Sequence, residues 1–298
     1  MTKPKGKRGA SRKMAKARDD HLVAEAQRLR GAIEQEEAEK NTTRESEPDL
    51  EPDQKRVYRE ALIALNKSGR MYAVGAAFAR HVYTNIWRPT KDLDVFVKPE
   101  DLCEVFAALQ AAGFETQVKD GHWLGKAWKE KSFIDLIFGT GHGHLPINDE
   151  AFAGCRDAEV LGVPTHLIPI EEMISSAAYI AGRNRFDGGE IAHLIRSTKG
   201  NLDWERILRR LSDNRELLLW HLTFFDFIYP GHAHYLPHEL MEELFAEAKE
   251  RWHSQKRSSR KFRGTLLDPF SYNVDVEDWG YEDSRIMEPI VNEKGELL

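Results

Sequence analysis

The sequence predicts an α+β protein in which a small mixed β-sheet is preceded by a charged tail and followed by a helical part. Three observations support this prediction. Short apolar runs typical of strands alternate with helical spacing between residues 54 and 138, and the spacing from residue 170 to 252 is almost wholly helical. The first 52 residues are polar and contain no aromatic residue. At 298 residues and 41% hydrophobic composition, the chain can bury a sizeable core.

The N-terminal region, residues 1–52, is expected to be a disordered or helical charged tail and linker. Residues 1–18 carry eight Lys or Arg and no acid, whereas residues 19–54 carry twelve acids and four basic residues. A helix is predicted over residues 19–40, followed by a proline-containing linker. The basic stretch could attract RNA or another polyanion, fold back on the acids that follow it, or stay solvated.

The sheet is expected within residues 53–168. Apolar spacing predicts, in order, a helix at 54–66, a strand at 71–74, a helix from Gly75 to residue 83, a strand at 93–97, a helix at 99–112, strands at 114–118, 123–128 and 133–138, and a hairpin at 158–168. The helical domain is expected over residues 169–253, with helices at 171–181, 188–197, 202–211, 215–228 and 237–252. Residues 254–298 lack a sustained period and are expected to form a tail that wraps the surface.

Composition narrows the classes of function. The net charge of -6 gives no global attraction to nucleic acid, so any such attraction must be local. Two cysteines without Cys-x-x-Cys spacing suggest neither a disulfide framework nor a zinc site. We find no export signal and no apolar run long enough to cross a membrane, and therefore expect a cytoplasmic protein without a membrane partner.

Two acids lie at the start of the strand predicted at residues 93–97: Asp92 just precedes it and Asp94 is its second residue. Because side chains alternate along a strand, both carboxylates project from the same face. Their repulsion is relieved by a divalent cation, and magnesium prefers such oxygen ligands. Two solvated acids on a surface strand are an equally common reading of this pattern taken alone.

Asp135 lies in the apolar run 133–138, which otherwise reads as buried on both faces. A lone buried charge is costly, and a local Arg or a strand end commonly satisfies it. If this strand lies beside the Asp92 and Asp94 strand, the three carboxylates form one metal-binding cage.

A phosphate site is predicted next to these acids. Gly75 permits close approach of the backbone, and the helix that it opens presents unpaired N–H groups to an anion. Arg88 and Lys91, just before the acidic strand, could add positive charge for a triphosphate. A simple strand-to-helix turn is the plainer reading of Gly75.

Taken together, the runs 73–76 (Ala-Val-Gly-Ala), 90–97 and 133–137 resemble the pattern of nucleotidyltransferases of the DNA polymerase β superfamily. That pattern is a hydrophobic-Gly-Gly/Ser turn, an Asp-x-Asp/Glu strand and a later strand with a single acid. The resemblance is strongest to bacterial minimal nucleotidyltransferases, including toxin-like members related to the AbiEii group. It covers about residues 71–197, since residues 183–195 resemble the Arg-rich helical segment of that group.

The resemblance implies a nucleotidyltransferase core that moves a nucleoside monophosphate from a nucleoside triphosphate to a hydroxyl of RNA or tRNA, a protein or a small molecule. It further implies Asp92, Asp94 and Asp135 as catalytic ligands of Mg²⁺ or Mn²⁺, and a toxin-like role with an antitoxin-like protein partner. The implied nucleotide contacts are Gly75, Ala76, Arg88, Lys91, Arg183 and Arg185; ordinary salt bridges are an equal reading of the last two. Ala76 departs from the pattern, because many relatives have Ser or Gly there.

Two alternatives remain open. A catalytically silent nucleotide-binding or scaffold protein could retain the same fold. The pairs His142/His144 and His232/His234 could bind a transition metal if further ligands converged on them, although no nearby residue completes either set.

Overall fold

The computed structural model describes Arg28, Gly31, residues 48–254 and residues 260–298. The chain divides into two units, 1–47 and 48–298. In the first unit both Arg28 and Gly31 are helical and exposed. The other residues of 1–47, and with them most of the tail predicted over 1–52 and of the helix predicted over 19–40, lie outside the described residues. In the second unit a helix, α2 (Pro52–Ser68), precedes the sheet.

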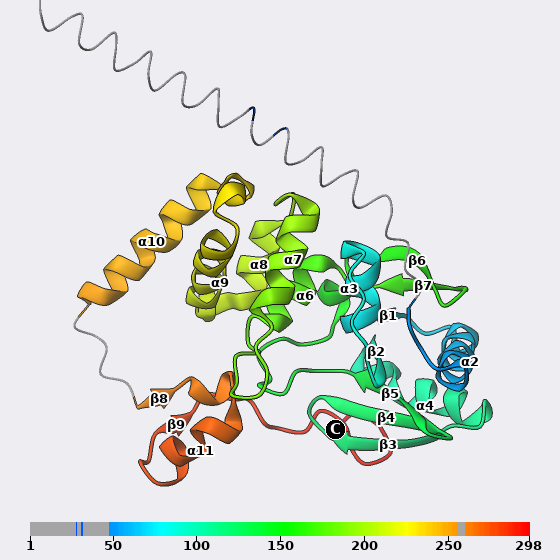
Figure 1. Ribbon diagram of the computed structural model, residues 1–298. Coiled ribbons are helices and arrows are strands. Elements are labelled where there is room, and N and C mark those ends of the chain that lie inside the picture. Colours follow the sequence, from blue (N-terminus) through cyan, green and yellow to red (C-terminus); the bar gives the residue numbers. More distant parts are fainter. Residues whose placement is uncertain (1–27, 29–30, 32–47, 255–259) are drawn as a thin grey trace, which may run out of the picture. The chain divides into compact units, whose positions relative to one another are not determined.

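A seven-stranded mixed sheet forms the centre of the second unit, with the strand order β3-β4-β5-β2-β1-β7-β6 (Figure 1). Its strands are β1 (Tyr72–Val74), β2 (Asp92–Val97), β3 (Glu115–Asp120), β4 (Leu124–Lys129), β5 (Ser132–Ile137), β6 (Arg156–Val160) and β7 (Val163–Leu167). The β2/β5 and β1/β7 pairs are parallel, and the other four pairs are antiparallel. The predicted α+β class is confirmed.

One face of the sheet is the apolar core. Along β2, Leu93, Val95 and Val97 are fully buried, and so are Ile134 and Leu136 of β5. Helix α2 packs with α4 (Leu102–Ala111) and also contacts β5 and β7, while α4 contacts β3. Their apolar faces give the sheet its main hydrophobic contact, and this burial fixes which side chains of β2 and β5 point to the other face.

The opposite face of β2 and β5 is only half-buried. In the parallel register, Asp94 lies directly beside Asp135, and the flanking pairs are Asp92 with Phe133 and Phe96 with Ile137. The sequence reading of residues 133–138 as buried on both faces was therefore wrong for this face. The strand faces a cavity there, which is why a carboxylate can occupy it.

Helices cover the edge of this second face. Helix α3 (Ala76–Thr84) contacts β2 and α7 (Gly188–Thr198), and α7 packs in turn against α6 (Ile170–Ala177) and α9 (Arg215–Ile228). Helix α8 (Trp204–Leu211) contacts α6 and α9. Figure 1 shows α6 to α9 gathered side by side next to α3, with α10 (His238–His253) beyond α9.

The C-terminal residues return to the sheet. Residues 260–298 include β8 (Lys261–Phe262), α11 (Pro269–Glu277) and β9 (Glu282–Asp283). The amides of Ile290 and Val291 then donate to the carbonyl of Gly121 in the β3–β4 turn, and the chain end lies beside this hairpin in Figure 1. The sequence predicted a wrapping tail but missed its short helix, because α11 buries none of its residues and so lacks an apolar stripe.

Other differences from the sequence predictions are small. A short helix, α5 (Asp149–Phe152), and the four 3₁₀ turns η1 (Pro99–Asp101), η2 (Ser212–Asn214), η3 (Pro230–Tyr235) and η4 (Gly264–Leu266) are additional. The domain boundaries at residues 52, 168 and 253 stay predictions. No helix among the described residues is both long enough and apolar enough to cross a membrane.

Candidate active site

Three carboxylates meet on the half-buried face of the sheet. One oxygen from each of Asp92, Asp94 and Asp135 lies within 4.8 Å of the other two. Alternation along β2 places the first two on one face, and the parallel β2/β5 register sets Asp135 beside Asp94. The three acids therefore lie close together, as the sequence analysis expected. In the described part of the chain this is the one such group of His, Cys, Asp or Glu with metal-binding spacing.

Burial and mutual repulsion perturb these acids. Burial, followed by the charges of Asp92 and Asp135, raises the pKa of Asp94 to about 7. The pKa of Asp135 is also raised by burial, against the opposing pull of Lys126. Three hard oxygen donors at this spacing fit Mg²⁺ or Mn²⁺, because a divalent charge offsets the repulsion that the fold imposes. The hydroxyl of Thr90 orients Asp92 by donating to its Oδ1 at 2.6 Å.

Lys126 of β4 is a residue of the site that the sequence reasoning missed. It lies opposite Asp135 in the antiparallel β4/β5 pair, and its Nζ is 2.6 Å from Oδ1 of Asp135. The same ammonium group lies 4.2 Å from the ring centroid of Phe133. A signal was available, since a hairpin between the strands predicted at 123–128 and 133–138 pairs residues 126 and 135 when its turn is symmetric.

The carboxylates line a cavity of about 420 Å³. Its polar residues from α7 and the preceding loop are Arg185, Asp187 and Glu190, and its apolar wall includes Phe96, Trp123 and Met173 together with residues of the C-terminal segment, namely Leu266, Leu267 and Pro269. Four parts of the chain, far apart in sequence, therefore contribute to one cavity. Such a concave site with converging polar groups is the usual form of a small-molecule site.

The structure gives a reason for glycine at position 75 that the sequence did not predict. Its φ of -125° is open to any residue, but a Cβ there would lie 2.2 Å from a ring carbon of Phe96. Glycine is therefore required by packing against β2. Ala76, which starts α3 and lines the cavity, has a φ of 42°, in the left-handed region that favours glycine.

Of the four basic residues predicted to contact the nucleotide, two lie at or next to the cavity and two lie away from it. Arg185 lines the cavity, and its Nε donates to both carboxylate oxygens of Asp187 while its Nη2 donates to Oδ2. Arg88 is 60% exposed and bonds Glu190, a cavity residue that Arg80 also contacts. Lys91 and Arg183 are exposed and do not line the cavity. The structure thus brings Arg185, and through Glu190 also Arg88, to the cavity.

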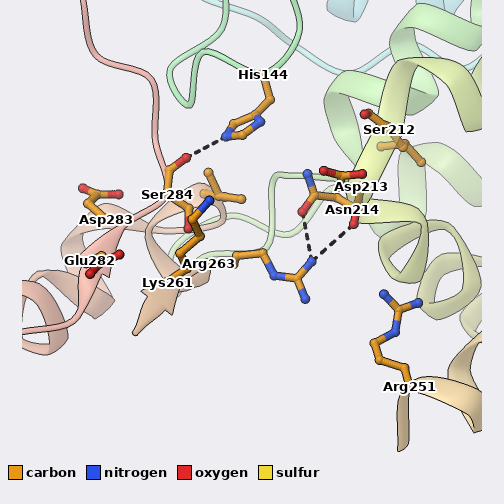
Figure 2. A pocket seen from close by; sticks show the side chains of 12 residues that line it. His144, Ser212, Asp213, Asn214, Arg251, Lys261, Arg263, Glu282, Asp283 and Ser284 are labelled. Atoms are coloured by element: carbon orange, nitrogen blue, oxygen red, sulfur yellow. Dashed lines mark hydrogen bonds between the residues drawn. The ribbon is translucent and has the colours of Figure 1, made fainter. Parts of the chain in front are cut away.

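A second cavity, of about 670 Å³, lies between the C-terminal segment and the start of α9. Figure 2 shows two of its lining side chains in internal hydrogen bonds: His144 bonds the carbonyl of Ser284, and Arg263 donates to the side chain of Asn214 and to the carbonyl of Asp213. It shares Leu266 with the first cavity but contains none of the three converging acids. His142 is buried against Tyr179 instead, with 3.9 Å between ring centroids.

Comparisons with known proteins give structural likeness only. No protein-family model and no curated protein matches the sequence. The chain is similar to the solution structure of the antibiotic-resistance factor ANT(2'')-Ia, with 16% identity, a TM-score of 0.38, and coverage of 68% of this chain and 95% of the other. The chain is also similar to the crystal structure of ANT(2'')-Ia with adenylyl-2''-tobramycin, with 14% identity and a TM-score of 0.40. That similarity covers 53% of this chain and 95% of the other.

The lincomycin-bound lincosamide antibiotic adenylyltransferase LnuA is also similar, at 13% identity and a TM-score of 0.36, over 47% of this chain and 94% of the other. Solved structures similar to this chain thus include a nucleotidyltransferase. Identities and TM-scores this low say nothing about the substrates of this chain, so its function has to be inferred from the cavity itself.

Proposed function

We propose that the chain is a metal-dependent nucleotidyltransferase, which transfers a nucleoside monophosphate from a nucleoside triphosphate to a hydroxyl group. The observation that carries the proposal is the meeting of Asp92, Asp94 and Asp135 at the floor of a cavity. Costly like charges gathered on one face of a sheet are explained by a cation and a polyphosphate substrate.

In the proposed reaction the acceptor oxygen attacks the α-phosphorus. A bond forms between them, the bond from the α-phosphorus to the bridging oxygen of the β-phosphate breaks, and pyrophosphate leaves with that electron pair. Asp135 accepts the proton of the hydroxyl through its second oxygen, since Oδ1 is held by Lys126. Asp92 and Asp94 would hold the divalent cation, which when bound offsets the charge of the triphosphate.

The residues around the cavity suit the triphosphate. Arg185 is held by two hydrogen bonds of its Nε, at 3.0 Å each, and one of its Nη2, at 2.7 Å, to Asp187, which leaves Nη1 available for phosphate. The start of α3 at Ala76 adds backbone N–H groups at the cavity wall. Arg88 adds positive charge beside Glu190.

The test measures pyrophosphate release and labelled product with each of the four nucleoside triphosphates, in Mg²⁺ or Mn²⁺, with pooled cellular acceptors. Asp94→Asn should lower the rate at least about 100-fold, as expected for loss of a group that stabilises the transition state. Asp149→Asn, a change at an exposed acid outside the cavity, is the matched control and should keep full activity. Absence of product from the unmodified protein under every condition would refute the proposal.

One observation favours a second candidate, a silent nucleotide-binding protein. Lys126 already compensates part of the charge of Asp135 without any metal. On this reading nucleoside triphosphates bind with an affinity that Asp135→Asn leaves unchanged, whereas the enzyme needs that carboxylate for turnover. Calorimetry of triphosphate binding beside the activity assay separates the two. A toxin-like role with an antitoxin-like partner, and a cytoplasmic location, stay predictions of the sequence.

A further inference from the structure

An exposed aromatic surface begins next to the cavity. Phe186 directly follows Arg185, and its ring contacts two rings of α9, with centroid distances of 5.6 Å to Trp220 and 5.3 Å to Phe224. Phe186 is 42% exposed, Trp220 is 44% exposed and Phe227, about two turns after Trp220 along α9, is 80% exposed. These four residues are called the aromatic strip below.

The loop that carries Phe186 is held in place. Its ends are joined by the bridge between Ala181 and Phe186 and by the amide of Gly182, which donates to the carbonyl of Arg185 at 2.8 Å. The amide of Arg183 donates to Asp268 of the C-terminal segment at 2.9 Å. These contacts use backbone groups of the loop, so they fix its course without the side chain of Arg183.

Positive charge accompanies the strip. Arg183 is exposed, and its guanidinium makes no hydrogen bond or ion pair with any residue that the structure describes. Arg185 stands between Arg183 and Phe186 in the same loop and reaches the cavity. An exposed guanidinium on the same loop as an exposed ring suits a ligand that has both phosphates and planar groups.

We infer that the strip and Arg183 form the acceptor-binding surface, and that the acceptor is a single-stranded polynucleotide whose terminal hydroxyl enters the cavity. Bases stack on exposed aromatic rings whatever their sequence, and arginines contact the backbone between them. A duplex keeps its base faces covered and does not fit such a surface. A second copy of this chain fits less well, because it would bring Arg183 of both copies to the same apolar surface.

This inference rests on the proposed function, because the terminal hydroxyl is an acceptor only if the chain transfers nucleotides. Binding of the strand to the surface can nevertheless be tested without turnover. Fluorescently labelled RNA and DNA strands of about 12 nucleotides, without triphosphate, would be titrated with the full chain and followed by anisotropy. Trp220→Ala and Arg183→Ala should each weaken binding at least about fivefold, the effect of losing one stacked base or one phosphate contact. Trp220→Phe should stay within about twofold of the unmodified chain, because a ring remains for stacking.

Matched controls come from exposed residues elsewhere. Phe245→Ala removes a ring of α10 that is 52% exposed, and Arg209→Ala removes a guanidinium of α8 that is 59% exposed. Neither should change the affinity for the strand. Arg183→Ala should also reduce the dependence of the binding constant on salt by about one counterion, whereas Trp220→Ala should leave that dependence unchanged.

The outcomes separate this inference from the proposed function. If strands bind through Trp220 and Arg183 but neither strands nor any pooled acceptor is labelled with any triphosphate, the surface stands and the proposed transfer fails. If strands do not bind while another acceptor is labelled, the transfer stands and this inference is overturned. It is also overturned if Trp220→Ala leaves strand affinity unchanged, or if light scattering shows a dimer that Trp220→Ala dissociates in a chain without strand affinity.

Discussion

The ammonium group of Lys126 lies 2.6 Å from Oδ1 of Asp135. One of the three clustered carboxylates therefore has a cationic partner within the chain, from the strand next to it. Among the described residues, Asp92 and Asp94 have no such ion-pair partner: Asp92 accepts a hydrogen bond from the hydroxyl of Thr90, and Asp94 feels the charges of Arg185 and Lys126 only at longer range. This asymmetry determines how the site should respond to loss of a charge or addition of a metal.

Replacing Lys126 by Met should destabilise the metal-free protein by about 1–3 kcal/mol, because Asp135 keeps its charge in a half-buried place without its partner. Mg²⁺ should then raise the melting temperature of the variant more than that of the unmodified chain. Thermal unfolding in EDTA and in Mg²⁺ measures both effects. Lys119→Met, on the neighbouring strand, removes a lysine that is bonded to Gln117 and serves as the control. An equal response of the two variants to Mg²⁺ would contradict this account.

Asp94→Asn, expected to lower activity at least about 100-fold, should stabilise the protein in EDTA. Asp94 is partly buried and lies close to the carboxylates of Asp92 and Asp135. A neutral side chain of the same shape therefore removes an unfavourable repulsion. The gain in free energy of unfolding should be about 1 kcal/mol or more, since one pKa unit corresponds to about 1.4 kcal/mol. Urea unfolding with EDTA measures it. Asp149→Asn should give no such gain, and destabilisation by Asp94→Asn would show that repulsion is not the dominant interaction.

Ala76→Gly should leave stability unchanged or raise it by up to about 1 kcal/mol. The left-handed φ of Ala76 costs an ordinary residue about 1–2 kcal/mol, which offsets the greater flexibility of glycine in the unfolded chain. Ala77→Gly, one residue further into the same helix, should instead cost about 1 kcal/mol. Urea unfolding of both variants gives the comparison, and equal losses at the two positions would rule out strain at Ala76.

His142 should make the protein sensitive to acid. Burial lowers the pKa of His142 to about 3, whereas an unfolded chain has a histidine pKa of about 6.5. The unfolded state therefore binds more protons between these values, so stability is present above pH 6.5 and is lost as the pH falls toward 3. The slope reaches about 1.4 kcal/mol per pH unit for one such group.

His142→Phe, which keeps an aromatic ring against Tyr179, should flatten this dependence by about one proton. Urea unfolding at a series of pH values between 7 and 4 measures the slope. Some dependence should remain, because burial also lowers the pKa of His221. An unchanged slope in the variant would show that His142 is not the group responsible.

The local pattern of the sequence determined much of this protein. Alternation in residues 92–97 placed Asp92 and Asp94 on one face, and the apolar spacing defined the strands and most of the helices. A symmetric hairpin turn would even have paired Lys126 with Asp135. These features depend on neighbours within a few residues, so they can be read directly from the order of side chains.

Tertiary structure alone decided the rest. Only the parallel pairing of β2 with β5 sets Asp135 beside Asp94, because no turn connects these strands and fixes their register. The requirement for Gly75 comes from the ring of Phe96 on a neighbouring strand, and the cavity wall formed by Leu266, Leu267 and Pro269 comes from the far end of the chain. Exposure of Phe186 and Trp220 likewise depends on which helix faces find partners. Such relationships arise from long-range packing, which spacing along the sequence does not encode.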